Sequence, residues 1–187
     1  ADPGGHREHL ETWTVADGLP GGFVQALLEE PRGALWIGTN EGLARLEGGR
    51  LAAWTTADGL PDRSVLALHQ EPAGALWIGT AGGGLSQFAD GRFATVQVGE
   101  GLAEDMVGRL LPDRSGRLWM CGNRGLSAVV VSEVEELFAG RRERIVPLTL
   151  GAGDGMRSAE CYGGTQPAGM VTRDGHLWFP TIRGAVV

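Results

Sequence analysis

Short segments in which apolar and polar residues alternate recur along the chain, separated by turns rich in glycine. Alternation with a period of two is typical of strands that bury one face. In the clearest stretch this pattern predicts four strands, at 65–69, 75–80, 85–88 and 93–98. Strands this short, joined by turns, indicate an all-β protein.

The strand pattern repeats at a nearly constant interval. Trp36 and Trp77 are 41 residues apart, and Trp77 and Trp119 are 42 residues apart. A period of this length with one tryptophan in each unit predicts sheets arranged radially, as in a β-propeller. A fourth unit with longer spacing contains Trp178. We therefore expect a flexible segment at 1–9, followed by a propeller of about four blades of four antiparallel strands. Its repeats run approximately over 10–50, 51–91, 92–150 and 151–187.

The number of strands leaves two architectures open. Residues 10–15 resemble the fourth strand of a unit, whereas the last unit has only its first three strands. In one architecture residues 10–15 complete the last blade and close the ring, which removes open sheet edges. In the other, the chain is a fragment of a larger propeller. Two copies that assemble into one ring are a variant of the second.

One stretch, 132–140, departs from the strand pattern. Ser132 is followed three residues later by Glu135, and the stretch ends at Gly140, which predicts a helix with a capping box and a glycine C-cap. The apolar stripe at helical spacing consists of Val134, Leu137 and Phe138. We expect a short helix, inserted in the third blade and packed on the propeller.

Composition excludes several classes of protein. The chain contains 32 glycines without the three-residue period of collagen, and 42% of its residues are hydrophobic, which argues against disorder. A net charge of −7 repels phosphates and argues against a nucleic-acid partner. No apolar run approaches the roughly 20 residues that span a membrane, so the chain is expected to be soluble as given.

The repeated motif residues are expected to be structural. Tryptophans that recur once per unit are typical of packing between neighbouring sheets, and aspartates that recur in turns accept hydrogen bonds from turn amides. The expected structural residues are Asp17, Trp36, Asp58, Trp77, Asp113, Trp119, Asp154 and Trp178. Two cysteines are too few for a disulfide framework, so Cys121 and Cys161 are expected to be free or buried thiols.

The motif order DGLP, strand, glycine turn and LWIGT-x-x-GL resembles the two-component regulator propeller repeat. The resemblance covers about 10–187, although the third unit has MCG in place of IGT. It implies the extracytoplasmic (periplasmic) sensor region of bacterial hybrid histidine kinases or membrane-bound diguanylate cyclases. It also implies attachment to a membrane only through domains absent from this chain, which also carry the kinase or cyclase activity.

Polar side chains of the loops at one end of the predicted channel are the candidate binding residues. Arginine suits carboxylates or phosphates, whereas asparagine and glutamate suit ligands rich in hydroxyl groups. The candidates are Asn40, Glu41, Arg63, Asn123, Arg124, Arg157, Glu160 and Arg183. The expanded loop 155–167, together with Arg124 and Arg183, is the favoured site for a small molecule, a carbohydrate or a protein partner. Ordinary solvated loop residues are the alternative.

No catalytic or metal-binding motif is evident. The four histidines show no HxH or HxxxH spacing, there is no CxxC, and GxSxG is absent. We therefore predict no catalytic residues, no metal and no cofactor, and a non-catalytic ligand-sensing or recognition propeller. Two other functions stay open: an oligomerisation module that forms a ring from two chains as a homodimer, and a propeller lyase or hydrolase.

Overall fold

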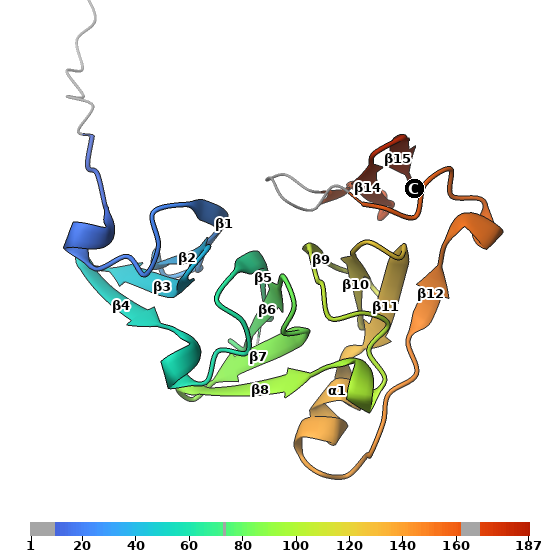
Figure 1. Ribbon diagram of the computed structural model, residues 1–187, viewed down its shortest axis with the longest axis horizontal. Coiled ribbons are helices and arrows are strands. Elements are labelled where there is room, and N and C mark those ends of the chain that lie inside the picture. Colours follow the sequence, from blue (N-terminus) through green and yellow to red (C-terminus); the bar gives the residue numbers. More distant parts are fainter. Residues whose placement is uncertain (1–9, 73, 162–168) are drawn as a thin grey trace, which may run out of the picture.

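The structure is a computed structural model that describes residues 10–72, 74–161 and 169–187. Its strands form separate antiparallel sheets in which each strand pairs with its neighbour in sequence. The sheets stand side by side around a common centre, so each is one blade of a propeller (Figure 1). The predicted all-β propeller of about four blades is therefore confirmed. The predicted segment 1–9 lies outside the described residues.

Blades 1 and 2 follow the repeat closely. Blade 1 consists of β1 (Val24–Glu29), β2 (Leu35–Thr39), β3 (Gly42–Glu47) and β4 (Arg50–Trp54). Blade 2 consists of β5 (Val65–Gln70), β6 (Leu76–Thr80), β7 (Leu85–Ala89) and β8 (Arg92–Val96). The fourth strand of blade 2 is shorter than predicted, because Val98 already begins a helical turn.

Blades 3 and 4 are less regular. Blade 3 consists of β9 (Arg109–Pro112), β10 (Arg117–Cys121), β11 (Leu126–Val130) and β12 (Leu148–Leu150), with α1 (Val131–Phe138) between the last two. Blade 4 consists, in the described residues, of β13 (Met170–Val171), β14 (Leu177–Thr181) and β15 (Gly184–Val186). The first strands of successive blades contact one another, so β1, β5, β9 and β13 surround the centre of the arc.

The recurring tryptophans of blades 1 to 3 hold successive blades together, whereas Trp178 of blade 4 is 41% exposed and does not pack between sheets as predicted. Trp36 lies in a buried cluster with residues of blade 2, and Trp77 lies in one with residues of blade 3. Trp119 packs against the buried Phe179 cluster of blade 4. A buried aromatic side chain removes about 200 Å² from water, which at roughly 25 cal/mol/Å² favours each contact by about 5 kcal/mol before entropy is counted.

Glycine in the LWIGT motif permits this close packing of blades. A Cβ atom on Gly79 would lie 2.5 Å from the backbone oxygen of Val107 in the next blade, and one on Gly38 would lie 2.6 Å from Cγ1 of Val65. Distances this short are not accommodated without a shift of the backbone. The glycine is therefore required by the approach of a neighbouring blade and not by its own backbone torsion.

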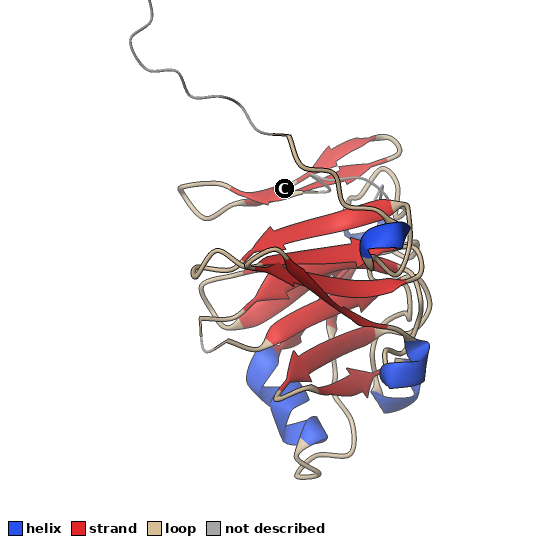
Figure 2. Ribbon diagram, turned by 90° about the vertical axis from the view of Figure 1, so that its left-hand side faces the viewer, coloured by secondary structure: helices blue, strands red, loops and turns tan. Residues whose placement is uncertain are grey.

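A short helical turn precedes each blade and ends at the acidic residue of the repeat motif, which is DGL in blades 1 and 2, EGL in blade 3 and DGM in blade 4. The turns are η1 (Val15–Asp17), η2 (Thr56–Asp58), η3 (Val98–Glu100) and η4 (Ala152–Asp154), and helical turns lie along one side of the blades in Figure 2. The Asp58 carboxylate accepts a hydrogen bond of 2.8 Å from the backbone nitrogen of Thr55, and Asp17 and Asp154 make the equivalent bond. The following Gly59 has a φ of 98°, which favours glycine.

Asp113 occupies the turn of the β9–β10 hairpin in blade 3. One of its carboxylate oxygens accepts hydrogen bonds from the backbone nitrogens of Ser115 and Arg117, at 2.7 and 3.0 Å. The other accepts a bond of 2.9 Å from the indole nitrogen of Trp119. This aspartate therefore joins the turn to the tryptophan that packs on the next blade.

The ring is open, and this corrects one of the two predicted architectures. Residues 10–14 form no strand, and no described residue completes blade 4 as a fourth strand. Trp13 instead packs with Leu19 and Ile37 on the outer face of blade 1. The two ends of the described chain lie at opposite ends of the arc (Figure 1), so residues 10–14 have no strand beside them with which to form a ladder.

The predicted helix is present, but it begins differently. α1 starts at Val131, its N-cap is Val130, and no side chain caps it, so the predicted capping box at Ser132 is wrong. Because Ser132 already lies within the helix, its side chain cannot take the N-cap position. At the other end Gly140 has the predicted left-handed conformation, with a φ of 68°. The ring of Phe138 stacks on Trp77 with 6.2 Å between centroids, which fixes the helix on the propeller.

Candidate functional site in the central channel

The innermost strands line an open depression of about 500 Å³ at the centre of the arc, here called the channel cavity. Its walls are mainly apolar, with Leu28 from β1, Leu68 from β5, Leu110 from β9 and Met170 from β13. All four blades thus contribute to one concave surface. Cavities with apolar walls and a few polar groups are the usual form of small-molecule sites.

Arg109 of β9 is the cationic side chain in the wall of this cavity. Arg109 precedes Trp119 by the same number of residues as Ala26 precedes Trp36 in blade 1 and Ala67 precedes Trp77 in blade 2. The equivalent residue of blades 1 and 2 is therefore alanine. The Nη2 atom of Arg109 donates a hydrogen bond of 3.1 Å to the carbonyl oxygen of Gly169 in blade 4. Its Nε atom is buried without a hydrogen-bond partner in the described part of the chain. A guanidinium therefore replaces a methyl group at the centre of the propeller.

His69 of β5 lines the same cavity and is mostly buried. Burial lowers the pKa of His69 by more than Glu71, with 3.7 Å between Nε2 and Oε1, raises it. The nearby Arg109 lowers this pKa a little further. Burial also lowers the pKa of Arg109, which nevertheless stays charged at neutral pH. The cavity accordingly combines a desolvated cation with a neutral imidazole.

A second depression, of about 770 Å³, adjoins the channel cavity and shares Leu28 and His69 with it. Two arginines line it, and one of them, Arg45, is already paired: its Nε is 2.7 Å from Glu30 Oε1, and its Nη1 is 2.7 Å from Glu47 Oε2. No aspartate or glutamate lines the channel cavity among the described residues. Arg109 is thus more available to an anion than Arg45 is.

The predicted binding residues fall into separate groups. Asn40, Glu41 and Arg63 meet between blades 1 and 2, where Arg63 Nη1 is 3.1 Å from Glu41 Oε1. The side-chain oxygen of Asn40 accepts a bond of 3.1 Å from the backbone nitrogen of Phe23. The ion pair joins the loops of two blades, whereas the bond of Asn40 lies within blade 1.

Asn123 and Arg124 lie in the turn between β10 and β11. The carboxylate of Glu104 accepts hydrogen bonds from both backbone nitrogens, at 3.0 and 3.1 Å. Glu104 was not among the predicted residues, although it belongs to the loop GLAED that the sequence places on the same face. It anchors the turn by its charge and leaves the side chains of Asn123 and Arg124 exposed.

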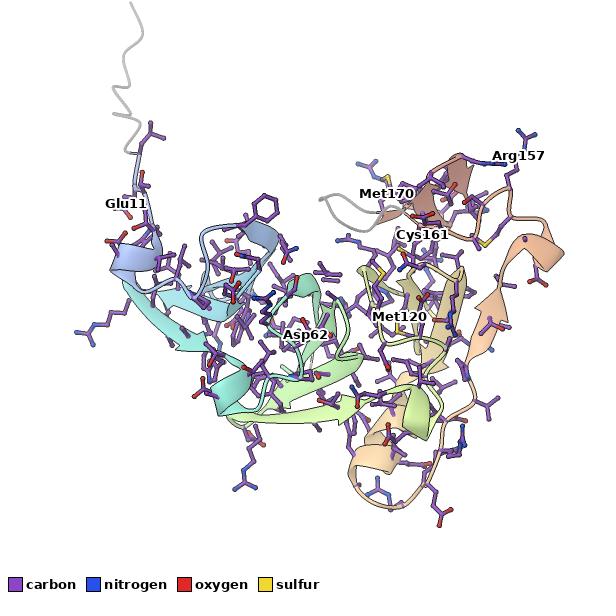
Figure 3. All side chains as sticks on the ribbon, viewed as in Figure 1. Glu11, Asp62, Met120, Arg157, Cys161 and Met170 are labelled. Carbon is purple, nitrogen blue, oxygen red and sulfur yellow. The ribbon has the colours of Figure 1, made fainter. Side chains whose placement is uncertain are left out.

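Arg157 and Arg183 line a smaller depression of about 270 Å³, here called the rim depression, together with Thr181. Arg157 projects from the outer side of blade 4, away from the centre of the arc (Figure 3). Glu160 is exposed, and its backbone oxygen accepts a bond of 3.2 Å from the nitrogen of Ile182. The rest of the predicted loop, 162–167, lies outside the described residues.

The sequence reasoning missed Arg109 and His69. The signal that identifies Arg109 is the exception to the repeat, an arginine where two other blades have alanine. Over residues 10–72, 74–161 and 169–187 no cluster of three metal-binding side chains occurs. The same residues include no helix that is both long and apolar enough to cross a membrane.

Comparison with known sequences identifies the repeat. The family model described as two component regulator propeller matches residues 18–41, which run from Gly18 of the DGL motif of blade 1 into the turn after its LWIGT motif. The family resemblance seen in the motifs is therefore confirmed. No curated protein matches the chain significantly.

Known structures share the fold. The extracellular domain of a hybrid two component system from B. thetaiotaomicron superposes with a TM-score of 0.77 at 18% identity, over 94% of this chain and 23% of that domain. A second such domain from the same organism gives 0.67 at 16% identity, over 84% and 22%. The chain thus spans less than a quarter of the length of either domain.

A structure with a different function is also similar. Virginiamycin B lyase from Staphylococcus aureus gives a TM-score of 0.59 at 16% identity, over 85% of this chain and 49% of the lyase. At such identities the similarity shows the fold alone, because propellers with one architecture carry unrelated functions.

Proposed function

From the two component regulator propeller repeat that the chain carries at residues 18–41, we propose that it is a non-catalytic, ligand-sensing propeller from an extracytoplasmic receptor region. The proposed ligand is a small molecule with an anionic group, bound in the channel cavity by Arg109. The observation that carries this proposal is the guanidinium at an alanine position, desolvated within apolar walls that contain no described carboxylate.

The chemistry of the cavity selects the class of ligand. A guanidinium forms charge-assisted hydrogen bonds with carboxylate or phosphate, and these bonds are stronger in a desolvated site than in water. The leucines and Met170 offer an apolar surface to the rest of the ligand. A carboxylate or phosphate on an apolar body satisfies both requirements.

The position of Arg109 also suggests how binding is transmitted. Its bond to Gly169 links the inner strand of blade 3 to the chain that enters β13 in blade 4. An anion that competes for this guanidinium changes the connection between the two blades. The relative placement of blades 3 and 4 is then coupled to occupancy, and a ligand with different affinities for two arrangements shifts their populations.

The experiment measures binding of carboxylates that differ in their apolar part, with inorganic phosphate alongside, by thermal shift and titration calorimetry. Arg109→Ala is the test variant, because alanine already occupies the equivalent positions of blades 1 and 2. Arg124→Ala is the matched control, since it removes the same charge from an exposed turn. The double variant Arg157→Ala/Arg183→Ala tests the rim depression that the sequence favoured.

The outcomes separate the two locations. Binding at the channel cavity predicts at least a tenfold loss of affinity in Arg109→Ala and little change in the other variants. Loss confined to the double variant moves the site to the rim depression. Unchanged affinity in all of them, in proteins that retain their thermal stability, excludes both sites.

A second candidate function, assembly, is favoured by the outer face of blade 4. Met170 and Trp178 form one cross-strand pair of this face and are 56% and 41% exposed, and Pro180 and Ala185 form the next pair. An exposed apolar sheet face of this kind is typical of an interaction surface.

If two chains complete a ring through this face of blade 4, light scattering shows a dimer, and Trp178→Glu converts the dimer to a monomer. A monomer at every accessible concentration contradicts the assembly function.

A further inference from the structure

Two cysteines from different blades lie in one buried cluster. Cys121 is the last residue of β10 in blade 3, and Cys161 belongs to the segment between η4 and β13. They are 2% and 4% exposed, and both are free thiols in the structure. The cluster that contains them also includes Phe179 of blade 4. The two cysteines therefore lie at the contact between blades 3 and 4.

The backbone around Cys161 fixes its position against both blades. Its nitrogen donates a hydrogen bond of 3.0 Å to the carbonyl oxygen of Gly122, the residue that follows Cys121. It also forms an antiparallel bridge with Thr181 of β14. Cys161 lies between blades 3 and 4 (Figure 3), where its thiol interacts with that of Cys121 in the same buried cluster.

The surroundings favour thiol chemistry at this contact. Cys121 is paired in register with Arg109, so a guanidinium lies on the adjacent strand. The hydrogen bond from Cys121 lowers the pKa of the Cys161 thiol, against the opposing effect of burial. The same bond, together with burial, raises the pKa of Cys121. Of the two, Cys161 is the better nucleophile for attack on an oxidant, because the thiolate is the reactive form.

We propose that Cys121 and Cys161 are a disulfide-forming pair that cross-links blade 3 to the segment entering blade 4. The oxidant is a disulfide, either of an oxidoreductase or of glutathione. The Cys161 thiolate attacks one oxidant sulfur and displaces a thiolate, which gives a mixed disulfide. Cys121 loses its proton, attacks the Cys161 sulfur of this intermediate and displaces the second thiolate. Two thiols of the protein become one disulfide, while the oxidant takes up two electrons and two protons and becomes two thiols.

The bond would have two consequences. Cys121 and Cys161 are 40 positions apart, and closing a loop of this length in the unfolded chain stabilises the native state. The disulfide would also form directly beside Arg109 and hold the start of blade 4 against β10. This second consequence rests on the proposed function, since it matters only if the channel cavity binds a ligand. Disulfides persist in the oxidising compartment in which such receptor regions lie.

The test uses the whole chain, purified under reducing conditions and then equilibrated with mixtures of oxidised and reduced glutathione. Intact mass and peptide mapping under non-reducing conditions report the bond, and the melting temperature is measured for the oxidised and reduced forms. The controls are Cys121→Ser and Cys161→Ser, in which no intramolecular bond can form. Because a buried hydroxyl can itself destabilise the protein, the quantity compared is the difference between oxidising and reducing conditions within each variant.

The expected result is a loss of two hydrogen atoms in the wild-type chain, a peptide that joins Cys121 to Cys161, and a gain in melting temperature of about 10 °C that both variants lack. Two thiols that remain free at equilibrium, or glutathione mixed disulfides alone, would overturn the proposal. Either result leaves the proposed function untouched. Formation of the disulfide without any anion binding would contradict the proposed function alone.

Discussion

Trp77 and Trp178 hold the same position in their repeats, yet Trp77 is fully buried and Trp178 is 41% exposed. The difference arises because Trp77 packs against blade 3, whereas Trp178 faces away from the cluster that joins blade 4 to blade 3. Trp77→Ala should therefore lower the free energy of unfolding by about 3–5 kcal/mol, and Trp178→Ala by about 1 kcal/mol or less. Urea denaturation of the monomer compares the two. Equal losses would mean that Trp178 is buried in solution.

Gly79 tests whether neighbouring blades approach as closely as the structure indicates. A Cβ atom there would lie 2.5 Å from the Val107 oxygen, so Gly79→Ala should destabilise the protein by about 1–3 kcal/mol. Gly153→Ala is the matched control, because nothing lies within 4 Å of its Cβ position. Chemical denaturation of both variants measures the difference. A neutral Gly79→Ala variant would show that blades 2 and 3 can separate at little cost.

The repeat made most of the fold predictable. Tryptophans at intervals of 41 and 42 residues locate the blades, and alternation locates the strands of blade 2 to within one or two residues. Strand ends next to the DGL motif were less predictable, because Val98 alternates like a strand residue but begins η3. Residues 10–14 have a strand-like sequence but form no strand, because no strand of blade 4 lies beside them. Whether blade 4 comes back to residues 10–14 depends on how all the blades are arranged, which the local sequence does not encode.

The candidate site was less predictable than the fold. Arg157 and Arg183 do come together, but on the outer side of blade 4. Arg109 sits in a strand that otherwise contains apolar residues, so a search among polar loop residues passes over it. Its importance depends on what surrounds it, namely the leucines of two other blades and the absence of a described carboxylate from the cavity wall.

Glu104 is predicted to hold the turn between β10 and β11. Its carboxylate accepts two backbone hydrogen bonds from Asn123 and Arg124, so Glu104→Ala should cost about 1–3 kcal/mol because those donors lose their partner. Glu104→Gln should cost less, because the amide keeps one acceptor oxygen. Thermal unfolding ranks the variants, with Glu143→Ala as an exposed control. If Glu104→Ala is as stable as that control, water replaces the carboxylate at no cost.

Glu30 and Arg45 are expected to make stability depend on acid pH. The bidentate hydrogen bond from Arg45, 2.7 and 2.9 Å long, lowers the pKa of Glu30 below its usual 4.5. Because the pKa is lowered, the Glu30–Arg45 pair stabilises the folded protein above about pH 4.5. This stabilisation is lost as the pH falls through the pKa that Glu30 has in the folded protein. Glu30→Gln should be less stable than wild type by roughly 1 kcal/mol at pH 7. That gap should close as the pH falls below 4, as measured by urea denaturation at a series of pH values. A gap that does not change with pH would show that the pair contributes nothing through charge.

His69 should make binding of an anion in the channel cavity depend on pH. In the free protein, burial lowers the pKa of His69 below 6.5, Glu71 opposes this effect, and Arg109 adds to it. The imidazole is therefore neutral at pH 7. Because the folded state disfavours its protonation, the fold loses stability as the pH falls below about 6.5. A bound carboxylate or phosphate supplies a negative charge and favours the protonated imidazole. Affinity should therefore rise as the pH falls from 7.5 to 5.5, by up to about tenfold per pH unit, with proton uptake.

Calorimetry in two buffers of different ionisation enthalpy measures that proton uptake. In His69→Gln the pH dependence should be lost while Arg109 still binds the anion. Wild-type affinity that stays constant over this range would show that the anion lies too far from His69 to affect its protonation.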